Sequence, residues 1–300
     1  MAALGLERKH GCMESKTAKR KHGKIIDAHA HIYPDAIARR AAQSTCDFYD
    51  GLPGRFDGRL DTLLEEEARL GIAAAVMLPV AVTPAQAQAV NRFAEETARH
   101  WPGRILPFAG LHPMDENLES EIDDIERRGF IGIKLHPDIQ KVDVNGPECR
   151  RMADRIQGRL PLYLHAGDAR FHYSNPERIA RLMDDFPDLE IICAHMGGWS
   201  EWPQARKYLK GRNIWVDTSS TMEFTTVEQA MECLDCFGVE RTFFGTDYPL
   251  WSMERAVENI YAMPLDEAQR EAVFHGNIER FLEERRAQAC AVCGSGGILF

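Results

Sequence analysis

The chain has 300 residues, of which 44% are hydrophobic and 27% are charged. These proportions are ordinary for a globular protein. No apolar run approaches the roughly 20 residues needed to cross a bilayer, so neither a membrane span nor a membrane partner is expected. The opening segment, MAALGLERKHGC, lacks an apolar core long enough for a secretory signal. We therefore expect a cytoplasmic protein.

Positive charge is concentrated at the N-terminus. Residues 1–24 contain seven Lys and Arg against two Glu, a net charge of +5. The whole chain carries −10, so the remainder carries −15, which disfavours nucleic acid as a partner because its phosphates need clustered cations. We expect residues 1–23 to form a disordered basic leader. A nucleic-acid-binding or targeting arm is the alternative.

Eight cysteines in a chain of this length do not suggest a disulfide framework. Cys193 lies in an apolar run and is expected in the core. Two CxxC pairs, Cys233/Cys236 and Cys290/Cys293, supply four thiolates that could hold a structural zinc ion. Because the first pair lies on a predicted helix and the second in a Gly-rich tail, we do not expect such a site.

Eight short β-rich runs alternate with helical stretches from Lys24 onward. Most of these runs are nearly continuously apolar, as is typical of parallel strands covered by helices. The predicted strands are residues 25–32, 73–80, 105–112, 130–136, 161–167, 189–195, 213–219 and 242–247.

Helix signals mark the segments between the strands. Thr-Pro at 83–84 and Ser-Asn-Pro at 174–176 predict an N-cap followed by proline at the first helical position. Gly129 predicts a helix C-cap. Residues 266–287 predict a closing helix after the last strand.

The alternation predicts a parallel α/β fold, and eight repeats in this length predict a (β/α)8 TIM barrel. We expect a single domain over residues 24–288 and a flexible tail over residues 289–300. The alternative is a doubly wound open sheet. That fold usually shows a Gly-rich phosphate fingerprint after its first strand, where this chain has a histidine pair instead.

Histidines gather where the predicted strands end, which is where barrel enzymes build their active sites. Five of the eleven histidines lie at or just past a strand end, and His29, Lys134 and Asp247 lie beside them. The five are His31, His112, His136, His165 and His195.

The first strand contains the motif DAHAH. Period-two alternation is expected to place Asp27, His29 and His31 on one face, where the two imidazoles are spaced to hold one metal ion. Two core histidines with satisfied hydrogen bonds are the alternative for this motif alone.

Three further strand ends favour the metal site. His165, His195 and Asp247 each end a separate strand, and packing does not explain that coincidence. Nitrogen ligands with one carboxylate suit Zn²⁺ first, or Mn²⁺ or Fe²⁺, with positions left open for water.

The motifs DAHAHIYP, GIKLHP, LHAG, AHMGG, GTDYP and HGNIERFL together resemble the amidohydrolase superfamily. They are most similar to the amidohydrolase-2 branch, which includes hydrolases and ACMSD-like decarboxylases. The resemblance implies that His29, His31 and His165 bind metal, and that His195 is either a second-metal ligand or a catalytic histidine. It implies that Asp247 binds metal and takes a proton from the metal-bound water.

The role of Lys134 determines whether one or two metal ions are expected. It resembles a lysine that is carbamylated in binuclear members of the superfamily, where it bridges two metals. The alternative is an unmodified lysine that pairs with Asp247 or with the substrate.

Substrate contacts are expected from the loop after the fifth strand. Arg170 is a candidate for a bidentate grip on a carboxylate, with His172 nearby. Trp199 is expected to wall the site, and His136 to line it. A surface arginine and a rim tryptophan are the alternatives.

We expect a metal-dependent hydrolase of an amide, ester or lactone bond in a small, carboxylated molecule. A metal-dependent, non-oxidative decarboxylase is the second hypothesis, and a non-catalytic binding protein is the third. The predicted partner is a small-molecule substrate, with a homodimer as a further possibility.

Overall fold

The computed structural model describes the backbone of residues 23–293 and 300, and the side chains of residues 23–288 and 300. The predicted leader, apart from Gly23, lies outside the described residues. So do most of the predicted tail and the side chains of Cys290 and Cys293. The expectations for these segments therefore stay predictions.

Every predicted strand has a counterpart, and the sheet is parallel throughout. Most strands are shorter than predicted because the polar residues at their ends leave the ladder. The strands are β1 (Ile25–Ala30), β2 (Ile72–Met77), β3 (Ile105–Pro107), β4 (Ala109–Gly110), β5 (Ile133–Leu135), β6 (Leu162–Leu164), β7 (Ile191–Cys193), β8 (Ile214–Asp217) and β9 (Thr242–Phe243).

The third predicted strand is divided into β3 and β4. β1, β2 and β3 form one hydrogen-bonded sheet, and β4 to β9 form the other. Pro107 has no amide hydrogen and cannot donate to the ladder. The neighbouring Phe108 amide still reaches the Met77 carbonyl at 3.0 Å, so the two sheets remain continuous there.

Hydrogen bonds between the first and last strands close the ring. The Ala28 amide donates to the Phe244 carbonyl at 2.8 Å, and the Asp247 amide donates to the His29 carbonyl at 2.9 Å. One step further, Ala30 and Tyr248 form a parallel bridge. The predicted (β/α)8 barrel is therefore confirmed, and the open-sheet alternative is wrong.

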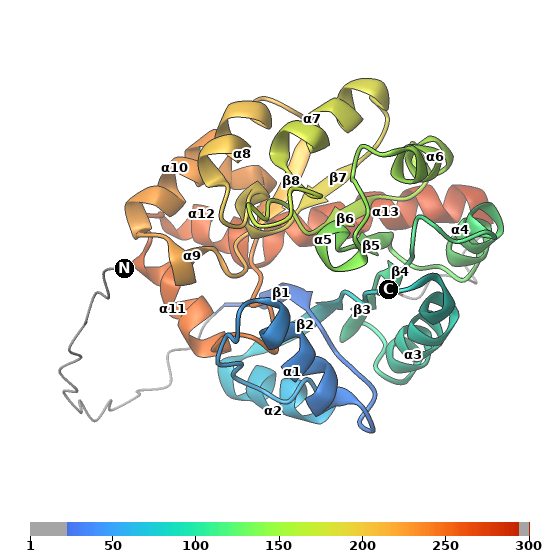
Figure 1. Cartoon of the computed structure of the whole chain (residues 1–300). Helices are drawn as coiled ribbons and strands as arrows, with labels where there is room; N and C mark the ends of the chain where they lie inside the picture. The colour runs from blue at the N-terminus through green and yellow to red at the C-terminus, as the bar shows by residue number, and fades with distance from the viewer. Residues whose placement is uncertain (1–22, 294–299) are drawn as a thin grey trace, which may run out of the picture.

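Helices surround the ring of strands (Figure 1). They are α1 (Ala38–Phe48), α2 (Leu60–Leu70), α3 (Ala87–His100), α4 (Leu118–Arg127), α5 (Pro137–Gln140), α6 (Pro147–Ile156), α7 (Pro176–Asp185), α8 (Trp202–Tyr208), α9 (Thr221–Phe224), α10 (Val227–Phe237), α11 (Met253–Ala262), α12 (Glu267–Glu271) and α13 (Asn277–Cys293). No described helix is long and apolar enough to cross a membrane.

The predicted caps are found. Thr83 forms a capping box with Gln86 on a short 3-10 turn that leads into α3. The Asn175 side chain accepts a hydrogen bond from the Glu177 amide at the start of α7. Gly129 follows α4 with a φ of +77°, which glycine adopts without strain.

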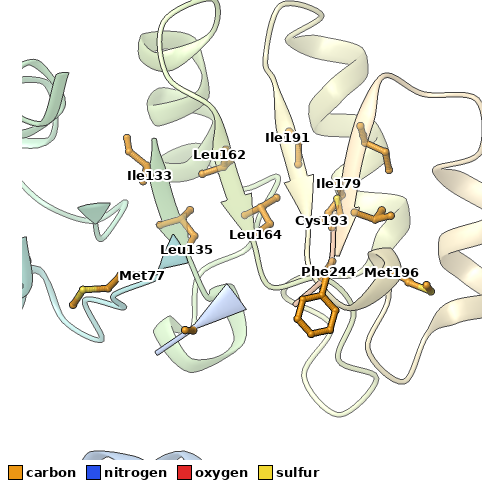
Figure 2. Close-up of a cluster of buried hydrophobic side chains, with 14 of the residues drawn as sticks. Met77, Ile133, Leu135, Leu162, Leu164, Ile179, Ile191, Cys193, Met196 and Phe244 are labelled. Carbon is orange, nitrogen blue, oxygen red and sulfur yellow. The ribbon is translucent and has the colours of Figure 1, made fainter. Parts of the chain in front are cut away.

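Two of the three apolar clusters among the described residues make up most of the core. One consists of strand residues such as Val76 and Ile192, with Phe281 from α13. It fills the ring and is closed at one end by that helix. The other lies between the strands and the outer helices, and Figure 2 shows its strand members, including Leu162 and Leu164.

The closing helix is longer than predicted. α12, a π-helical turn over Ala272–Gly276, and α13 carry the chain to Cys293. Residues 289–293 are therefore part of α13, and the predicted boundary of a flexible tail stays a prediction. The segment from 287 to 293 reads AQACAVC, and helix propagation adds one hydrogen bond per residue once α13 is docked.

The described cysteine side chains are free thiols. Cys233 and Cys236 lie on α10, as predicted, and neither belongs to a metal-binding group among the described residues.

Glu67 on α2 is a fully buried acid. The Arg104 guanidinium donates to its Oε2 at 2.9 Å and 3.2 Å, but Oε1 has no partner. Burial raises the pKa of Glu67 to about 8, although Arg104 acts in the opposite direction. Folding therefore favours the protonated acid.

We expect Glu67→Gln to weaken the pH dependence of stability. With a folded pKa above the unfolded one, Glu67 contributes stability that is fully present below about pH 4.5 and is lost as pH rises to about 8. Relative to wild type, the variant should gain about 1–3 kcal/mol of unfolding free energy between pH 5 and 8, measured by urea denaturation. Exposed Glu65→Gln is the control. Parallel pH curves for wild type and Glu67→Gln would contradict the expectation.

Candidate metal centre

An irregularity in β1 turns two histidines toward one space. Ile26 and Ala28 belong to the cluster inside the ring, so strict alternation would turn His29 away from the interior. The pairing with β2 shifts register between Asp27 and Ala30, and such bulges re-aim the side chains that follow. His29 and His31 consequently both line the central cavity.

The same irregularity separates Asp27 from the histidines, so the predicted common face is wrong for this residue. Its carboxylate accepts hydrogen bonds from the amides of His29 at 3.0 Å and Thr246 at 2.9 Å. Asp27 thereby ties β1 to the segment that presents Asp247.

His29, His31 and Asp247 converge. The Nε2 atoms of the two histidines lie 3.2 Å apart, and Oδ1 of Asp247 lies 3.5 Å from each. Ser220 donates from its hydroxyl to the other oxygen of Asp247. Asp247 has a φ of +58°, so its backbone is in the left-handed region.

The hydrogen bonds behind these histidines leave their inner nitrogens free. Nδ1 of His29 donates to Asp217 at 2.8 Å, and Nδ1 of His31 donates to the Leu78 carbonyl at 2.7 Å. Burial, with the nearby His29, lowers the pKa of His31 to about 3. In neutral imidazoles of this tautomer, the Nε2 lone pairs point at each other and at Asp247, which is the arrangement that metal-binding histidines need.

This donor set fits a divalent metal ion. Two nitrogens held about 2.1 Å from one ion lie about 3.0–3.4 Å apart for angles between octahedral and tetrahedral, which brackets the observed separation. Without an ion, two acceptor nitrogens and a carboxylate would face each other without a proton, at a cost that burial increases.

His165 and His195 continue the site from β6 and β7. The Ser219 carbonyl accepts from Nδ1 of His195 at 3.0 Å, so Nε2 of neutral His195 is an acceptor. It lies 3.0 Å from Nδ1 of His165, which must donate. Nε2 of His165 is then a buried acceptor without a partner, as expected for a group that binds an external ligand.

His165 nevertheless lies outside the three-residue cluster. The ring centres of His165 and His195 are 4.8 Å apart, and those of His195 and His29 are 5.1 Å apart. The predicted ligands therefore surround one cavity. The ring of His195 lies between His165 and the cluster of His29, His31 and Asp247.

Two other groups of buried side chains lie close enough to be considered as metal sites: His29, His195 and Asp217, and His136, His165 and Asp138. In the first, Nδ1 of His29 is already bonded to Asp217. In the second, the rings of His136 and His165 are stacked with centres 3.9 Å apart and planes within 9°. Their lone pairs lie in parallel ring planes and do not converge, so we assign no ion to either group.

Asp217, which the sequence reasoning did not select, organises the site from behind. Its Oδ2 accepts from Nδ1 of His29 and from the Tyr163 hydroxyl at 2.6 Å. Its Oδ1 accepts from the amides of His195 at 3.1 Å and Ser219 at 2.9 Å. The sequence signal that could have identified Asp217 is its position near the C-terminal end of the predicted strand 213–219.

Lys134 is buried and lines the cavity. Its Nζ lies 5.0 Å from the centre of the Tyr163 ring. Burial lowers its pKa to about 8, while Asp217 and Asp247 act in the opposite direction. Among the described residues it has no ion pair within 4.0 Å, so the alternative of a pair with Asp247 is not formed. The carbamate bridge stays a prediction.

The cavity above these residues has a volume of about 410 Å³. Its floor is polar and includes His136 as well as the ligand histidines. Its walls are largely apolar, with Ile37 just before α1, Phe48 at the end of α1, and Val80 and Val82 from the segment after β2. Arg40 of α1 also lines it.

Three predicted substrate contacts lie elsewhere. Arg170 does not line the cavity, and its donors are taken by Asp168, by Asp50 and by the Phe48 carbonyl. His172 is exposed on its loop. Trp199 lines a smaller recess shared with His195 and Asp247 rather than the main cavity. The main cavity is instead walled on one side by α1, which was not among the predicted substrate contacts.

Comparisons with known proteins show what the chain is similar to. The sequence profile of the amidohydrolase family (Amidohydro_2) matches residues 26–283. Decarboxylase orsB of Emericella nidulans is 24% identical over 324 residues, with 86% of this chain and 97% of that protein covered. The gamma-resorcylate decarboxylase of a Rhizobium species is 24% identical over 246 residues, with 63% and 73% covered.

A solved structure shares the fold. It is a dihydroxybenzoic acid decarboxylase from Polaromonas sp. JS666 with bound manganese and the inhibitor 2-nitroresorcinol. The TM-score is 0.68 at 18% sequence identity, and 89% of this chain and 99% of that chain are covered.

Proposed function

The chain belongs to the amidohydrolase family, and on that premise we propose that it is a metal-dependent, non-oxidative decarboxylase of a small aromatic carboxylic acid. The observation that carries the proposal is the cluster of His29, His31 and Asp247 at the floor of a cavity with apolar walls. That combination suits a flat, apolar ring with an acidic substituent directed at the floor.

The expected hydrolase is supported only by membership of the family, whose members include both activities. Two relatives with a described activity, orsB and the gamma-resorcylate decarboxylase, are decarboxylases, which favours the second hypothesis over the first. The argument for a hydrolase depended on a bridging Lys134. Of the three groups of possible ligands among the described residues, we assign an ion only to His29, His31 and Asp247.

We propose one divalent ion per chain, held by His29, His31 and Asp247, with His165 on the same cavity. Manganese is supported by the Polaromonas structure, and zinc and iron suit the same nitrogen and oxygen donors. A bound ion would supply Lewis-acid stabilisation of negative charge on a substrate oxygen.

In the proposed reaction a proton replaces the carboxylate on the ring. The ring carbon gains a C–H bond, the C–C bond to the carboxylate breaks, its electron pair returns to the ring, and CO₂ leaves. His195 is the group best placed to deliver the proton because its ring lines the cavity. The Ser219 carbonyl holds its Nδ1–H, so proton exchange is directed to Nε2, the nitrogen that accepts from Nδ1 of His165 in the structure without substrate.

The apolar wall of the cavity contributes by excluding water. Phe48, Val80 and Val82 contact whatever fills the cavity and exclude water from the reacting carbon. Exclusion of water strengthens electrostatic interactions at the floor and favours protonation by a positioned side chain.

The decisive experiment combines two isotopes. The full chain, reconstituted with Mn²⁺ or Zn²⁺, is incubated in D₂O with a panel of hydroxybenzoic acids and, separately, in H₂¹⁸O with their esters and lactones. We expect CO₂ release with one deuterium on the vacated ring carbon for each CO₂, measured by mass spectrometry. Incorporation of ¹⁸O into a carboxyl product, with no CO₂ released, would overturn the proposal in favour of the hydrolase.

The remaining partner predictions are part of the same proposal. A small-molecule substrate is supported by the cavity and by the ligand in the Polaromonas structure. A homodimer and a cytoplasmic location stay predictions.

A further inference from the structure

The hydroxyl of Tyr49 lies between two imidazoles at the edge of the cavity. It is 2.8 Å from Nε2 of His136 and 3.5 Å from Nδ1 of His165. Tyr49 directly follows α1 and lines both the main cavity and the smaller recess. The residue is only 8% exposed, so the hydroxyl is held in the site by a buried side chain.

Neither imidazole nitrogen beside the Tyr49 hydroxyl can accept its proton. The Ile139 amide donates to Nδ1 of His136 at 3.4 Å, which places the proton of neutral His136 on Nε2. Nδ1 of His165 is protonated as well, because it donates to His195. The Tyr49 oxygen is therefore an acceptor toward the protein. Within the described part of the chain, no acceptor remains for its own hydroxyl proton.

Arg170 fixes the ring of Tyr49 from the other side. Its guanidinium carbon lies 5.1–5.2 Å from the centres of four aromatic rings, those of Phe48, Tyr49, Phe171 and Trp199. It also pairs with Asp168, which is completely buried, at 2.8 Å. A guanidinium that stacks and pairs at once restricts both partners.

Arg170 and the four rings around it form a cage, which joins segments that are distant in sequence. Arg170 belongs to the loop after β6, and it donates to the Phe48 carbonyl at the end of α1 at 2.9 Å. The ring of Trp199, from the segment after β7, lies 4.9 Å from that of Tyr49. The Tyr49 ring is thus contacted by the loop after β6 and by the segment after β7.

We infer that Tyr49 donates a hydrogen bond from its hydroxyl to an anionic oxygen of the substrate, and that Arg170 is a positioning residue that acts through Tyr49. The inference rests on the proposed function only for the identity of the acceptor, a carboxylate or phenolate oxygen attached to an aromatic ring. Bonds from a neutral donor to a charged acceptor are among the stronger ones in proteins.

The test measures binding, so it does not depend on turnover. The probe is 2-nitroresorcinol, titrated into the Mn²⁺-loaded full chain and followed by its absorbance. Tyr49→Phe keeps the ring in its cage and removes only the hydroxyl. We expect its dissociation constant for the probe to rise about 10-fold or more. Tyr208→Phe on α8, distant from the cavity, is the matched control.

Arg170→Lys tests the positioning role. Lysine keeps a positive charge beside Asp168 but loses the planar fork, so the fold has a better chance of surviving than with alanine. We expect the variant to bind the probe less tightly than wild type, by no more than the factor seen for Tyr49→Phe. The double variant should bind no more weakly than Tyr49→Phe alone, because Arg170 acts through the missing hydroxyl. Thermal melts verify that each variant is folded.

The outcomes separate this inference from the proposed function. Wild-type affinity in Tyr49→Phe, or no binding of the probe by the loaded wild type, would overturn the donor role. Additive losses in the double variant would overturn the positioning role of Arg170. A wild type that binds the probe through Tyr49, yet releases no CO₂ from any acid in the panel, would contradict only the decarboxylase.

Discussion

Asp247→Asn is expected to weaken metal binding at least 100-fold and to lower the rate of the catalysed reaction by about a thousandfold. The substitution removes the negative charge from the oxygen that lies 3.5 Å from both histidine nitrogens. The amide is a poor ligand for a transition metal and has no charge to offset that of the ion.

Asparagine is the appropriate replacement because of the backbone. With a φ of +58°, alanine at position 247 would add about 1–2 kcal/mol of strain, whereas asparagine adopts this region readily. A loss of function in Asp247→Asn therefore reports on the charge.

Metal content per chain after gel filtration, measured by mass spectrometry, and CO₂ release test the expectation. Asp235→Asn, an exposed substitution on α10, is the control. Full metal content in Asp247→Asn would remove Asp247 from the ligand set, and an unchanged rate would remove it from the reaction.

Asp217→Asn is expected to destabilise the fold by about 3–5 kcal/mol and to weaken metal binding about 10–100-fold. Asp217 is completely buried, and hydrogen bonds from its neighbours, including His29 and Ser219, lower its pKa even though burial alone would raise it. Each of its two oxygens accepts from at least two donors.

The asparagine side chain would replace one of the two acceptor oxygens by an NH₂ group. In either orientation of the amide, that group faces hydrogen-bond donors. If the NH₂ group replaces Oδ2, it meets Nδ1 of His29 and the hydroxyl of Tyr163. If it replaces Oδ1, it meets the amides of His195 and Ser219. Repulsion releases His29 in the first case and moves the backbone before His195 in the second.

Urea denaturation and metal titration measure the two effects. Ser219→Ala is the matched control, because it removes one donor from Oδ1 and leaves the backbone amides in place. We expect it to cost about 1 kcal/mol. An Asp217→Asn protein with the stability and metal affinity of wild type would contradict the role assigned to Asp217.

The local sequence pattern was sufficient to predict the strands and helices and to predict which end of the barrel holds the site. Each strand was visible as a short apolar run, and each cap as a two- or three-residue signal such as Thr83 with Pro84. These features depend on neighbours in sequence. Eight repeats of one unit then leave few closed arrangements, which is why the barrel could be predicted.

Side-chain direction at the strand ends was less predictable. Strict alternation grouped Asp27 with His29 and His31, but the register shift against β2 sends Asp27 to backbone amides and both histidines to the cavity. The position of a bulge depends on how two strands pair, so it cannot be predicted from the sequence of one strand alone.

The sequence by itself determined the barrel and the residue types at its strand ends. Only the tertiary structure decided that Asp217 accepts a hydrogen bond from His29, that Arg170 stacks on the Tyr49 ring outside the main cavity, and that α1 lines this cavity. The physical reason is that hydrogen-bond partners and cavity walls come from segments far apart in the chain. Their meeting depends on how the loops pack over the strand ends, which no local pattern of residues specifies.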